Sequence, residues 1–240
     1  MDKKQAHKEV LELIDKINYY NDKYYQEDIS EISDYEFDQM LEKLNRLEAE
    51  FPEFKYAYSP TQRVGGTITK NFKTVFHKFP MLSLSNTYSE DEIREFDKRI
   101  SKMIGDEVVE YICELKFDGV AISITYEKGI LVQAVTRGDG EKGDDVTANV
   151  KTIRNLPLKL KGTGYPDLFE VRGEVFMPRK VFDQLNLERK QNNELLLANP
   201  RNTASGTLKM QDSSIVARRK LDCFLYGLLG ENIGTETHLE

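Results

Sequence analysis

The sequence lacks the features that mark membrane-inserted and secreted proteins. No run approaches the roughly 18 consecutive apolar residues that cross a bilayer. The N-terminus, MDKKQAHKEV, has no apolar signal core, so we expect a cytoplasmic protein. At 240 residues, 39% of them hydrophobic and 31% charged, the chain can form one large globular domain, or a small domain joined to a medium one.

Cysteine is scarce, and the chain has no surplus of basic residues. Cys113 and Cys223 both lie in apolar, strand-like runs. Two cysteines make neither a disulfide framework nor a zinc site, so we predict reduced, buried thiols. The net charge of −7 argues against a stand-alone nucleic-acid-binding domain, because such domains carry positive charge to neutralise phosphates. Nucleic acid remains possible as a substrate held by other domains.

The first 60 or so residues have the periodicity of amphipathic helices. From Lys8 to Tyr24, apolar side chains recur every three or four residues. A second helix is predicted to begin near Ser33, where Ser33 and Glu36 fit a capping box, and to stop before Phe51-Pro52. Each helix has one apolar stripe, so together they form a small module that must pack against another part of the protein. A turn-rich stretch follows, and we place the domain boundary near residue 70.

The remainder of the chain predicts an α+β domain. A helix should begin at Ser89, with Ile93, Phe96 and Ile100 as its apolar stripe. From Val108 onward the period changes from helical to two, which predicts strands over residues 108–126, 129–136, 168–176 and 221–229, with a hairpin turn at 127–129. Strands joined by short turns, with the helices set aside, indicate antiparallel sheets. No G-x-G-x-x-G follows a strand, which excludes a Rossmann domain.

The most informative segment runs from Tyr111 to Ile124. On a strand, Glu114, Lys116 and Asp118 would share one face. One interpretation is a solvated face with a salt bridge of little energetic value. The other is a lysine nucleophile, which needs desolvation or nearby positive charge to attack as the free amine, with Asp118 orienting it or accepting its proton. Gly119 would then allow a ligand or another strand to approach the backbone closely.

Lys116-Phe117-Asp118-Gly119 resembles the K-x-D-G motif of covalent nucleotidyltransferases, the superfamily of DNA ligases, RNA ligases and mRNA-capping enzymes. The motif alone is weak, because four loosely specified positions recur by chance. Further segments, in the same order along nearly the whole chain, resemble motifs of the bacterial NAD-dependent DNA ligases: Ser59–Gly65, Pro80–Leu84, Ala134–Gly140, Gly143–Val150, Phe169–Phe176 and Ala198–Leu208.

The resemblance implies two domains and one reaction. Residues 1–69 would form a helical domain that binds nicotinamide mononucleotide (NMN). Residues 70–240 would form an adenylation domain of the covalent-ligase nucleotidyltransferase type, unrelated to ATP-grasp enzymes and incomplete at its C-terminal end, with antiparallel sheets and flanking helices. Lys116 would attack the α-phosphorus of NAD, release NMN and form lysyl-AMP. The full-length enzyme would pass AMP to the 5′-phosphate of nicked DNA and seal the nick.

The resemblance also assigns the candidate site residues. Lys116 and Asp118 would be catalytic. The NAD-binding residues would be Ser83, Leu84, Glu114, Arg137, Glu174 and Arg201 around the nucleotide, and Tyr24, Tyr25, Asp34, Phe37 and Asp38 around the nicotinamide, where aromatic faces can stack on the cationic ring. Two positions depart from the family pattern. Tyr25 stands where some members have histidine, and Phe37 stands where tyrosine is common, so the contact of that hydroxyl is lost.

The remaining expectations concern metals and partners. Mg²⁺ is expected through phosphates and waters, without a dedicated protein site. Zn²⁺ is expected only in downstream domains that the resemblance implies and this sequence does not contain. These are an OB-fold, a four-cysteine zinc site, helix-hairpin-helix repeats and a BRCT domain. NAD and, in the full-length protein, nicked duplex DNA are the expected partners of a monomer that does not bind membranes.

Alternatives remain open at this stage. Arg137 could be a solvated turn residue, Glu174 could form a structural ion pair with Arg172, and the Tyr/Asp-rich helices could form a packed junction. The whole chain could instead be an ATP- or GTP-using nucleotidyltransferase, which would have no need to hold nicotinamide. It could also be a non-catalytic nucleotide-binding module.

Overall fold

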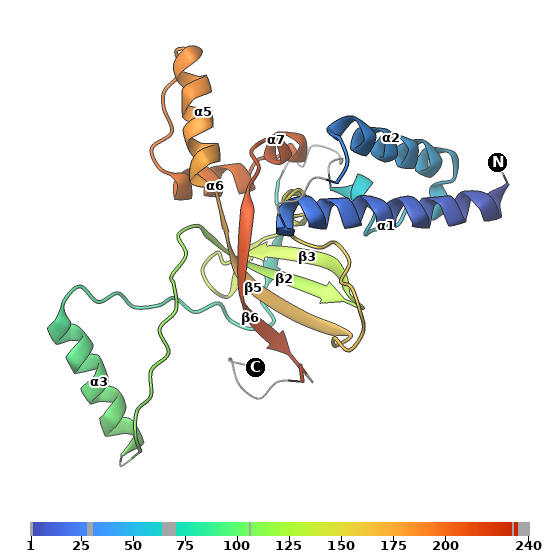
Figure 1. The fold of residues 1–240 in the computed structure, drawn as a ribbon. Coiled ribbons are helices and arrows are strands. Elements are labelled where there is room, and N and C mark those ends of the chain that lie inside the picture. Colours follow the sequence, from blue (N-terminus) through green and yellow to red (C-terminus); the bar gives the residue numbers. More distant parts are fainter. Residues whose placement is uncertain (1, 28–30, 64–70, 106, 232, 235–240) are drawn as a thin grey trace.

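A computed structural model describes residues 2–27, 31–63, 71–105, 107–231 and 233–234, without the side chains of residues 24–27 and 34. In chain order the elements are α1 (Lys3–Glu27), α2 (Asp34–Glu50), η1 (Pro52–Phe54), η2 (Pro60–Gln62), β1 (Thr74–Phe76), α3 (Glu90–Ile104), β2 (Val120–Glu127), β3 (Ile130–Thr136), β4 (Lys142–Asp144), α4 (Thr147–Val150), β5 (Leu168–Phe176), α5 (Arg179–Gln191), α6 (Pro200–Leu208), α7 (Ser213–Arg218) and β6 (Asp222–Gly230) (Figure 1). No helix in these described ranges has the length and apolar character needed to cross a membrane.

The two predicted N-terminal helices are confirmed and pack on each other. The hydroxyl of Ser33 accepts a hydrogen bond from the backbone N–H of Glu36, whose carboxylate accepts from the N–H of Ser33, so the capping box is complete. Helix α2 ends at Glu50, before Phe51-Pro52, as predicted. The shared core of the module consists of Val10, Leu13, Ile14, Ile17, Leu44 and Leu47.

The second half of the chain is built on a four-stranded antiparallel sheet with the order β3-β2-β5-β6. Glu127 pairs with Ile130, so β2 and β3 are joined by the two residues Lys128 and Gly129, which both have positive φ, as a tight hairpin requires. The hairpin predicted from Glu127-Lys128-Gly129 is therefore confirmed. A second sheet contains β1 and β4.

One face of the four-stranded sheet forms the main core. Ile122, Ile124 and Tyr126 alternate along β2 and are almost fully buried, as period-two side chains on one face should be. Ala204 and Leu208 of α6, with buried residues of α4 and α7, belong to the same cluster. Helices α4, α6 and α7 therefore flank the sheet, and the α+β class predicted from the sequence is confirmed.

The strand predicted from Val108 onward is wrong over its first half. Strand β2 begins only at Val120, and the preceding residues are extended without strand pairing. Leu115, which on a strand would face away from Lys116 and into the core, is 82% exposed. Alternating side chains favour a strand only where a neighbouring strand supplies backbone hydrogen bonds, and none of the described strands pairs with this stretch.

Helix α3 begins where it was predicted but buries none of its residues. The hydroxyl of Ser89 accepts from the N–H of Glu92, as the spacing of a capping box requires, but the Glu92 carboxylate accepts from the N–H of Tyr88 and not from that of Ser89. Figure 1 shows α3 standing away from the sheet at the end of two extended stretches. The apolar stripe of α3 is therefore exposed, with Ile93 and Phe96 at its surface.

The two cysteines differ in environment. Cys223 is buried on β6, as predicted, and burial together with the nearby Asp222 charge raises the pKa of its thiol to about 12. Cys113 is exposed, because it lies in the stretch that forms no strand. The prediction of two buried thiols therefore holds for Cys223 alone.

A buried arginine joins the helical module to the rest of the chain. Arg63, at the end of η2, donates hydrogen bonds to the carbonyl oxygens of Lys151 at 3.3 Å and of Ile153 and Leu156 at 2.9 Å each. Its forked guanidinium reaches all three carbonyls, which the single ammonium group of a lysine could not do in the same geometry. Charge-assisted bonds of this kind are strong where water is excluded. Arg63 therefore anchors the C-terminal end of the helical module to the segment that follows α4.

We predict that Arg63→Ala lowers the free energy of unfolding by about 2–4 kcal/mol, since three charge-assisted bonds to carbonyls are removed. Urea unfolding followed by circular dichroism measures this. The matched control is Arg46→Ala, which removes an exposed i,i+4 pair with Glu42 and should change stability by at most about 0.5 kcal/mol. Equal effects of the two substitutions would contradict the role given to Arg63.

Candidate active site

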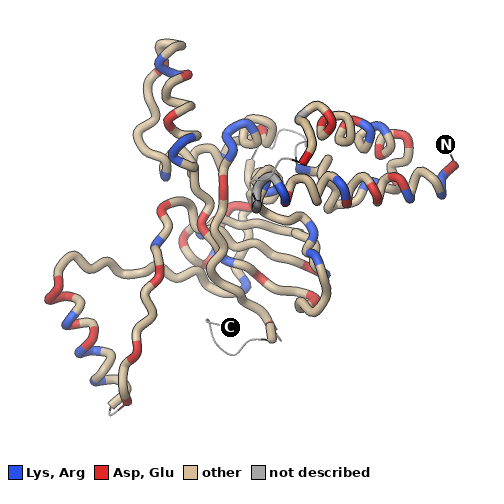
Figure 2. The backbone as a smooth tube through the Cα atoms, in the orientation of Figure 1, with Lys and Arg blue, Asp and Glu red and all other residues tan. Residues whose placement is uncertain are grey.

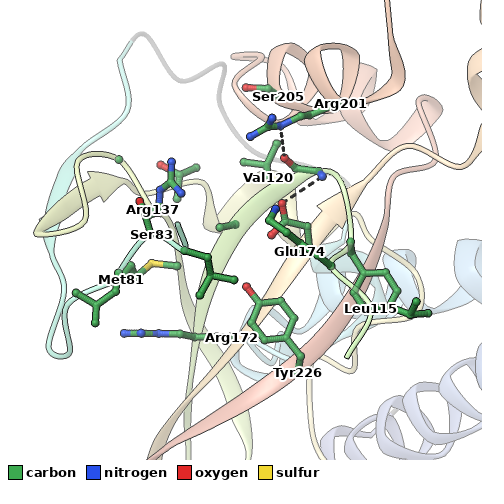
Figure 3. A pocket seen from close by; sticks show the side chains of 18 of the residues that line it. Met81, Ser83, Leu115, Val120, Arg137, Arg172, Glu174, Arg201, Ser205 and Tyr226 are labelled. Atoms are coloured by element: carbon green, nitrogen blue, oxygen red, sulfur yellow. Dashed lines mark hydrogen bonds between the residues drawn. The ribbon is translucent and has the colours of Figure 1, made fainter. Parts of the chain in front are cut away.

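A pocket of about 980 Å³ lies against the sheet, a volume suited to a nucleotide-sized ligand (Figure 3). Its walls come from segments far apart in the sequence. They are the stretch before α3, the extended segment before β2, the turn after β3, strands β5 and β6, and helix α6. The lining residues used below are Met81, Ser83, Leu84, Glu114, Lys116, Gly119, Arg137, Arg172, Glu174, Arg201, Asn202, Ser205, Lys209 and Tyr226.

Gly119 is where the pocket walls meet. Its N–H donates to the Glu174 carboxylate at 3.1 Å, and its carbonyl accepts from Nε of Arg201 at 3.2 Å, the two dashed lines of Figure 3. A Cβ on Gly119 would lie 2.2 Å from the carbonyl oxygen of Val175 on β5. Only glycine can stand this close to the neighbouring strand, which confirms the close approach predicted for it.

The residue after Lys116 anchors the segment that carries it. The ring of Phe117 stacks on Phe224 of β6 at a centroid distance of 4.1 Å, and Phe224 in turn stacks on Phe176 of β5 at 4.7 Å. Such stacks add to the energy of burying the rings. Lys116 thus lies between an aromatic anchor at Phe117 and the fixed peptide of Gly119. The sequence had suggested that alternation along a strand positions Lys116, but these two contacts position it instead.

A tight turn presents Arg137 to the pocket. The backbone N–H of Arg137 donates to the carbonyl of Ala121 at 3.1 Å, and Nε2 of His77 lies 3.1 Å from the carbonyl of Arg137. Gly138 follows with a φ of +57°, and a Cβ there would lie 1.9 Å from the carbonyl oxygen of Lys142. The glycine is therefore required by the turn, and the exposed Arg137 side chain points into the pocket region (Figure 3).

The segment with Ser83 and Leu84 is held by backbone contacts. Met81 N–H donates to the carbonyl of Gly140 at 2.8 Å. The Arg172 guanidinium donates to the carbonyls of Phe79 and Pro80, at 2.5 and 3.0 Å. Within the described residues Arg172 forms no ion pair with Glu174, so the structural pair considered from the sequence is wrong. Ser83 and Leu84 are exposed on the pocket wall.

Glu174 is the half-buried carboxylate of the site. Burial raises the pKa of its carboxyl, and four features oppose that rise: the hydrogen bond from Gly119 and the charges of Lys116, Arg201 and Arg137. The three cations that act on one carboxylate are the same three that the sequence singled out. A group of cations around a single acid is suited to bind a phosphate together with a ribose hydroxyl.

Most of the predicted nucleotide residues therefore lie around one pocket: Ser83, Leu84, Glu114, Lys116, Arg137, Glu174 and Arg201. Asp118 does not line the pocket: it is 76% exposed, with its carboxylate 3.4 Å from Nε of Arg201. Phe37 is half-buried against the core of the helical module, and the exposed Asp38 follows it. Neither lines this pocket. The side chains of Tyr24, Tyr25 and Asp34 lie outside the described residues.

Sequence reasoning missed other residues of the pocket. Arg172 had been considered only as an ion-pair partner, and Ser205 had been quoted only as part of a motif. Lys209 and Tyr226 had not been singled out. Lys209 contributes a further cation, paired with Asp144 at 2.8 Å. The Tyr226 ring lies on the pocket wall near Arg172 and Glu174 (Figure 3). Tyr226 lies on strand β6 and Lys209 at the end of helix α6, and neither position has a local sequence pattern that predicts a place in the pocket.

Among the described residues, no group of three or more His, Cys, Asp and Glu side chains is arranged to hold a metal ion. The pocket is instead a mixture of cations and single carboxylates. Figure 2 shows that acidic and basic residues are interspersed along α1, α2 and α3. The side chains that line the pocket are thus more often basic than acidic, whereas α1, α2 and α3 carry both signs.

Fold and pocket together define the class of the protein. A helical module precedes an antiparallel sheet with flanking helices, and the pocket on that sheet gathers a lysine, arginines and glutamates. This is the arrangement of an adenylation domain of the nucleotidyltransferase type.

Comparison with known proteins identifies the family. The model for the NAD-dependent DNA ligase adenylation domain matches residues 69–240, and that for the DNA ligase-like, N-terminal NAD+-binding domain matches residues 3–65. The DNA ligase of Cytophaga hutchinsonii is 58% identical over 238 residues, which are 99% of this chain and 35% of that protein. The DNA ligase of Bacteroides fragilis is 57% identical over 224 residues, 93% of this chain and 34% of that protein. The chain belongs to the NAD-dependent DNA ligase adenylation domain family and spans about 35% of the length of these relatives.

We predict that Glu174→Gln changes how stability depends on pH. Because burial raises the pKa of Glu174 in the folded protein, ionising this carboxyl costs more in the folded than in the unfolded state. Its contribution to stability is therefore lost as pH rises through the folded pKa. The glutamine variant lacks this loss, so its stability relative to the parent should increase from about pH 4 to about pH 7.

Thermal melts across that pH range measure the effect, with Glu127→Gln, an exposed position at the end of β2, as the matched control. A relative stability of the Glu174 variant that falls with rising pH would show that the surrounding cations outweigh burial.

Proposed function

We propose that this chain is the NAD-using adenylation module of a bacterial DNA ligase, with Lys116 as the nucleophile. The observation that carries the proposal is the placement of Lys116 beside Glu174, Arg137 and Arg201 in one pocket of a chain that matches the family from end to end. We further propose a division of labour in which residues 1–69 bind the nicotinamide half of NAD and residues 70–240 bind the AMP half.

The proposed reaction follows from the pocket's charges. The Lys116 amine, as the free base, attacks the α-phosphorus of NAD. An N–P bond forms, the P–O bond to NMN breaks, and NMN leaves with that oxygen while the amine loses a proton. Arg137 and Arg201 would bind the phosphate oxygens as charge builds on them. The Arg201 side chain is held by its bond to the Gly119 carbonyl, and the backbone of Arg137 is fixed in its turn, so little backbone reorganisation would be needed during the step.

The carboxylates would hold the nucleoside. Glu174, half-buried and already accepting from Gly119, has a second oxygen that could accept from a ribose hydroxyl. Glu114 would contact the adenine, and the Tyr226 ring offers an apolar wall for its face. Asp118, exposed and near Arg201, is better placed to orient that arginine than to fill the pocket itself.

Mg²⁺ would reduce the negative charge of the phosphates during attack. The pocket offers it only separate carboxylates, so we propose that phosphates and water supply most of its ligands. In the longer protein, lysyl-AMP would pass AMP to the 5′-phosphate of nicked DNA, the 3′-hydroxyl would displace AMP, and a phosphodiester bond would result. NAD and chromosomal DNA both occur in the bacterial cytoplasm, where we place the protein, as a monomer. Zn²⁺ would belong to other parts of that protein.

We predict that the protein gains one covalent AMP when incubated with NAD and Mg²⁺, and that Lys116→Ala does not, because the attacking amine is absent. Intact-protein mass spectrometry measures both. Lys180→Ala serves as the control, since this lysine of α5 is exposed and does not line the pocket. Labelling of the Lys116 variant at the parent's rate would place the nucleophile elsewhere. A parent that binds NAD but is never labelled would favour the non-catalytic binding module.

A second prediction concerns the nicotinamide clamp proposed for Tyr24, Tyr25, Asp34, Phe37 and Asp38. Lysyl-AMP no longer contains the group that these residues would grip, so their binding energy acts only on the first transition state. Asp34→Ala should therefore slow lysyl-AMP formation by about one to two orders of magnitude, the loss of one charge-assisted contact. Transfer from the pre-adenylated full-length protein to nicked DNA should be unchanged.

Single-turnover measurements of each step separate the two effects. Glu50→Ala, which removes an exposed carboxylate at the opposite end of α2, is the control and should alter neither step. Equal losses in adenylation and in transfer would mean that Asp34 supports the fold, and the clamp would have to be withdrawn.

A further inference from the structure

The C-terminal end of α6 is held by a side chain from outside the pocket. The last carbonyls of a helix have no partner within it and need an outside donor. The amide nitrogen of Asn149 lies 2.8 Å from the carbonyl oxygen of Leu208 and 2.8 Å from that of Met210. Both N–H groups of this amide are thus used, and Asn149 is only 2% exposed.

Helix α6 has two faces with different surroundings. Arg201, Asn202 and Ser205 line the pocket. The opposite face, with Thr203, Ala204, Thr207 and Leu208, is buried against the domain. A rotation or slide of α6 would therefore move the guanidinium of Arg201 relative to the peptide of Gly119 that it contacts.

Asn149 is itself tied to the sheet. Val146 N–H donates to the carbonyl of Ala134 on β3, and Ala134 N–H donates to the hydroxyl of Thr147, each at 2.9 Å. These bonds fix the start of α4, from which Asn149 reaches α6. A continuous chain of hydrogen bonds therefore runs from β3 through α4 to the end of α6. The salt bridge between Asp144 and Lys209 is a second link beside it.

We propose that Asn149 is a positioning residue for adenylation: it fixes the C-terminal end of α6 so that Arg201 stays at the pocket. It touches neither the pocket nor the reacting atoms, and it acts through Arg201. The proposal rests on the proposed function, because the effect of Arg201 is expressed as formation of lysyl-AMP. The chemistry of the side chain suits this role, since a neutral amide satisfies two buried carbonyls without burying a charge.

The test combines a double-mutant cycle with hydrogen exchange. Asn149→Ala should slow single-turnover lysyl-AMP formation by between about tenfold and about a hundredfold, the range expected from a small displacement of a catalytic group. In an Arg201→Ala background the same substitution should cost less than about twofold, because the group that it positions is gone. Amides of α6 should also exchange faster in Asn149→Ala than in the parent, while those of β2 and β5 should not.

Asn155→Ala is the matched control. It removes another amide-to-carbonyl bond, from Asn155 to Cys223 at 2.9 Å, which does not involve α6. It should leave the rate of adenylation and the exchange of α6 at the parent's values. If Asn149→Ala does not fold, Asn149→Ser, which retains one donor, takes its place in the same cycle with a smaller expected loss.

Two results would overturn the proposal even if Asn149→Ala slows adenylation. In one, the fold-reductions in adenylation rate caused by Asn149→Ala and Arg201→Ala multiply in the double variant, as they would if Asn149 had only a general structural role. The other is unchanged exchange of α6. A parent that forms no lysyl-AMP would overturn the proposed function and the positioning role together. A parent that reacts normally, alongside an Asn149 variant that reacts equally well, overturns the positioning role alone.

Discussion

The close approach of Gly119 to β5 is the constraint on which the pocket depends. Its peptide lies against the carbonyl of Val175 with no room for a side chain, and it joins Glu174 on one side to Arg201 on the other. Lys116 lies three residues before Gly119, so the fixed peptide limits where the Lys116 side chain can lie. An acid from β5, a cation from α6 and an amine from the preceding segment are thereby fixed relative to one another. Such pre-organised charge is what phosphoryl chemistry requires.

The elements that could be predicted from the sequence are those whose signal is local. The hairpin between β2 and β3 follows from two residues that accept positive φ, and the start of α2 from a cap at Ser33. The stretch before Val120 has equally good alternation and is not a strand. Alternation describes how side chains would be distributed, whereas a strand exists only when another strand pairs with it. The local sequence of this stretch does not show whether another strand pairs with it.

The site shows the same division. Lys116, Arg137, Glu174 and Arg201 could be found because each lies in a segment with a recognisable pattern, and the fold brings these segments together. Lys209 and Tyr226 could not, since their place in the pocket depends on where a helix ends and how an edge strand is registered. The contact of Arg172 with the carbonyls of Phe79 and Pro80 joins residues more than ninety positions apart, which no local pattern encodes.

The central claim is that this pocket holds AMP joined to Lys116, and a crystal structure of the protein after incubation with NAD and Mg²⁺ tests it most directly. The account predicts electron density that continues from Nζ of Lys116 to a phosphorus atom. The phosphate should lie near Arg137 and Arg201, and the ribose should lie near Glu174. Adenylate attached to another lysine, or a nucleotide bound away from the Gly119 peptide, would contradict it.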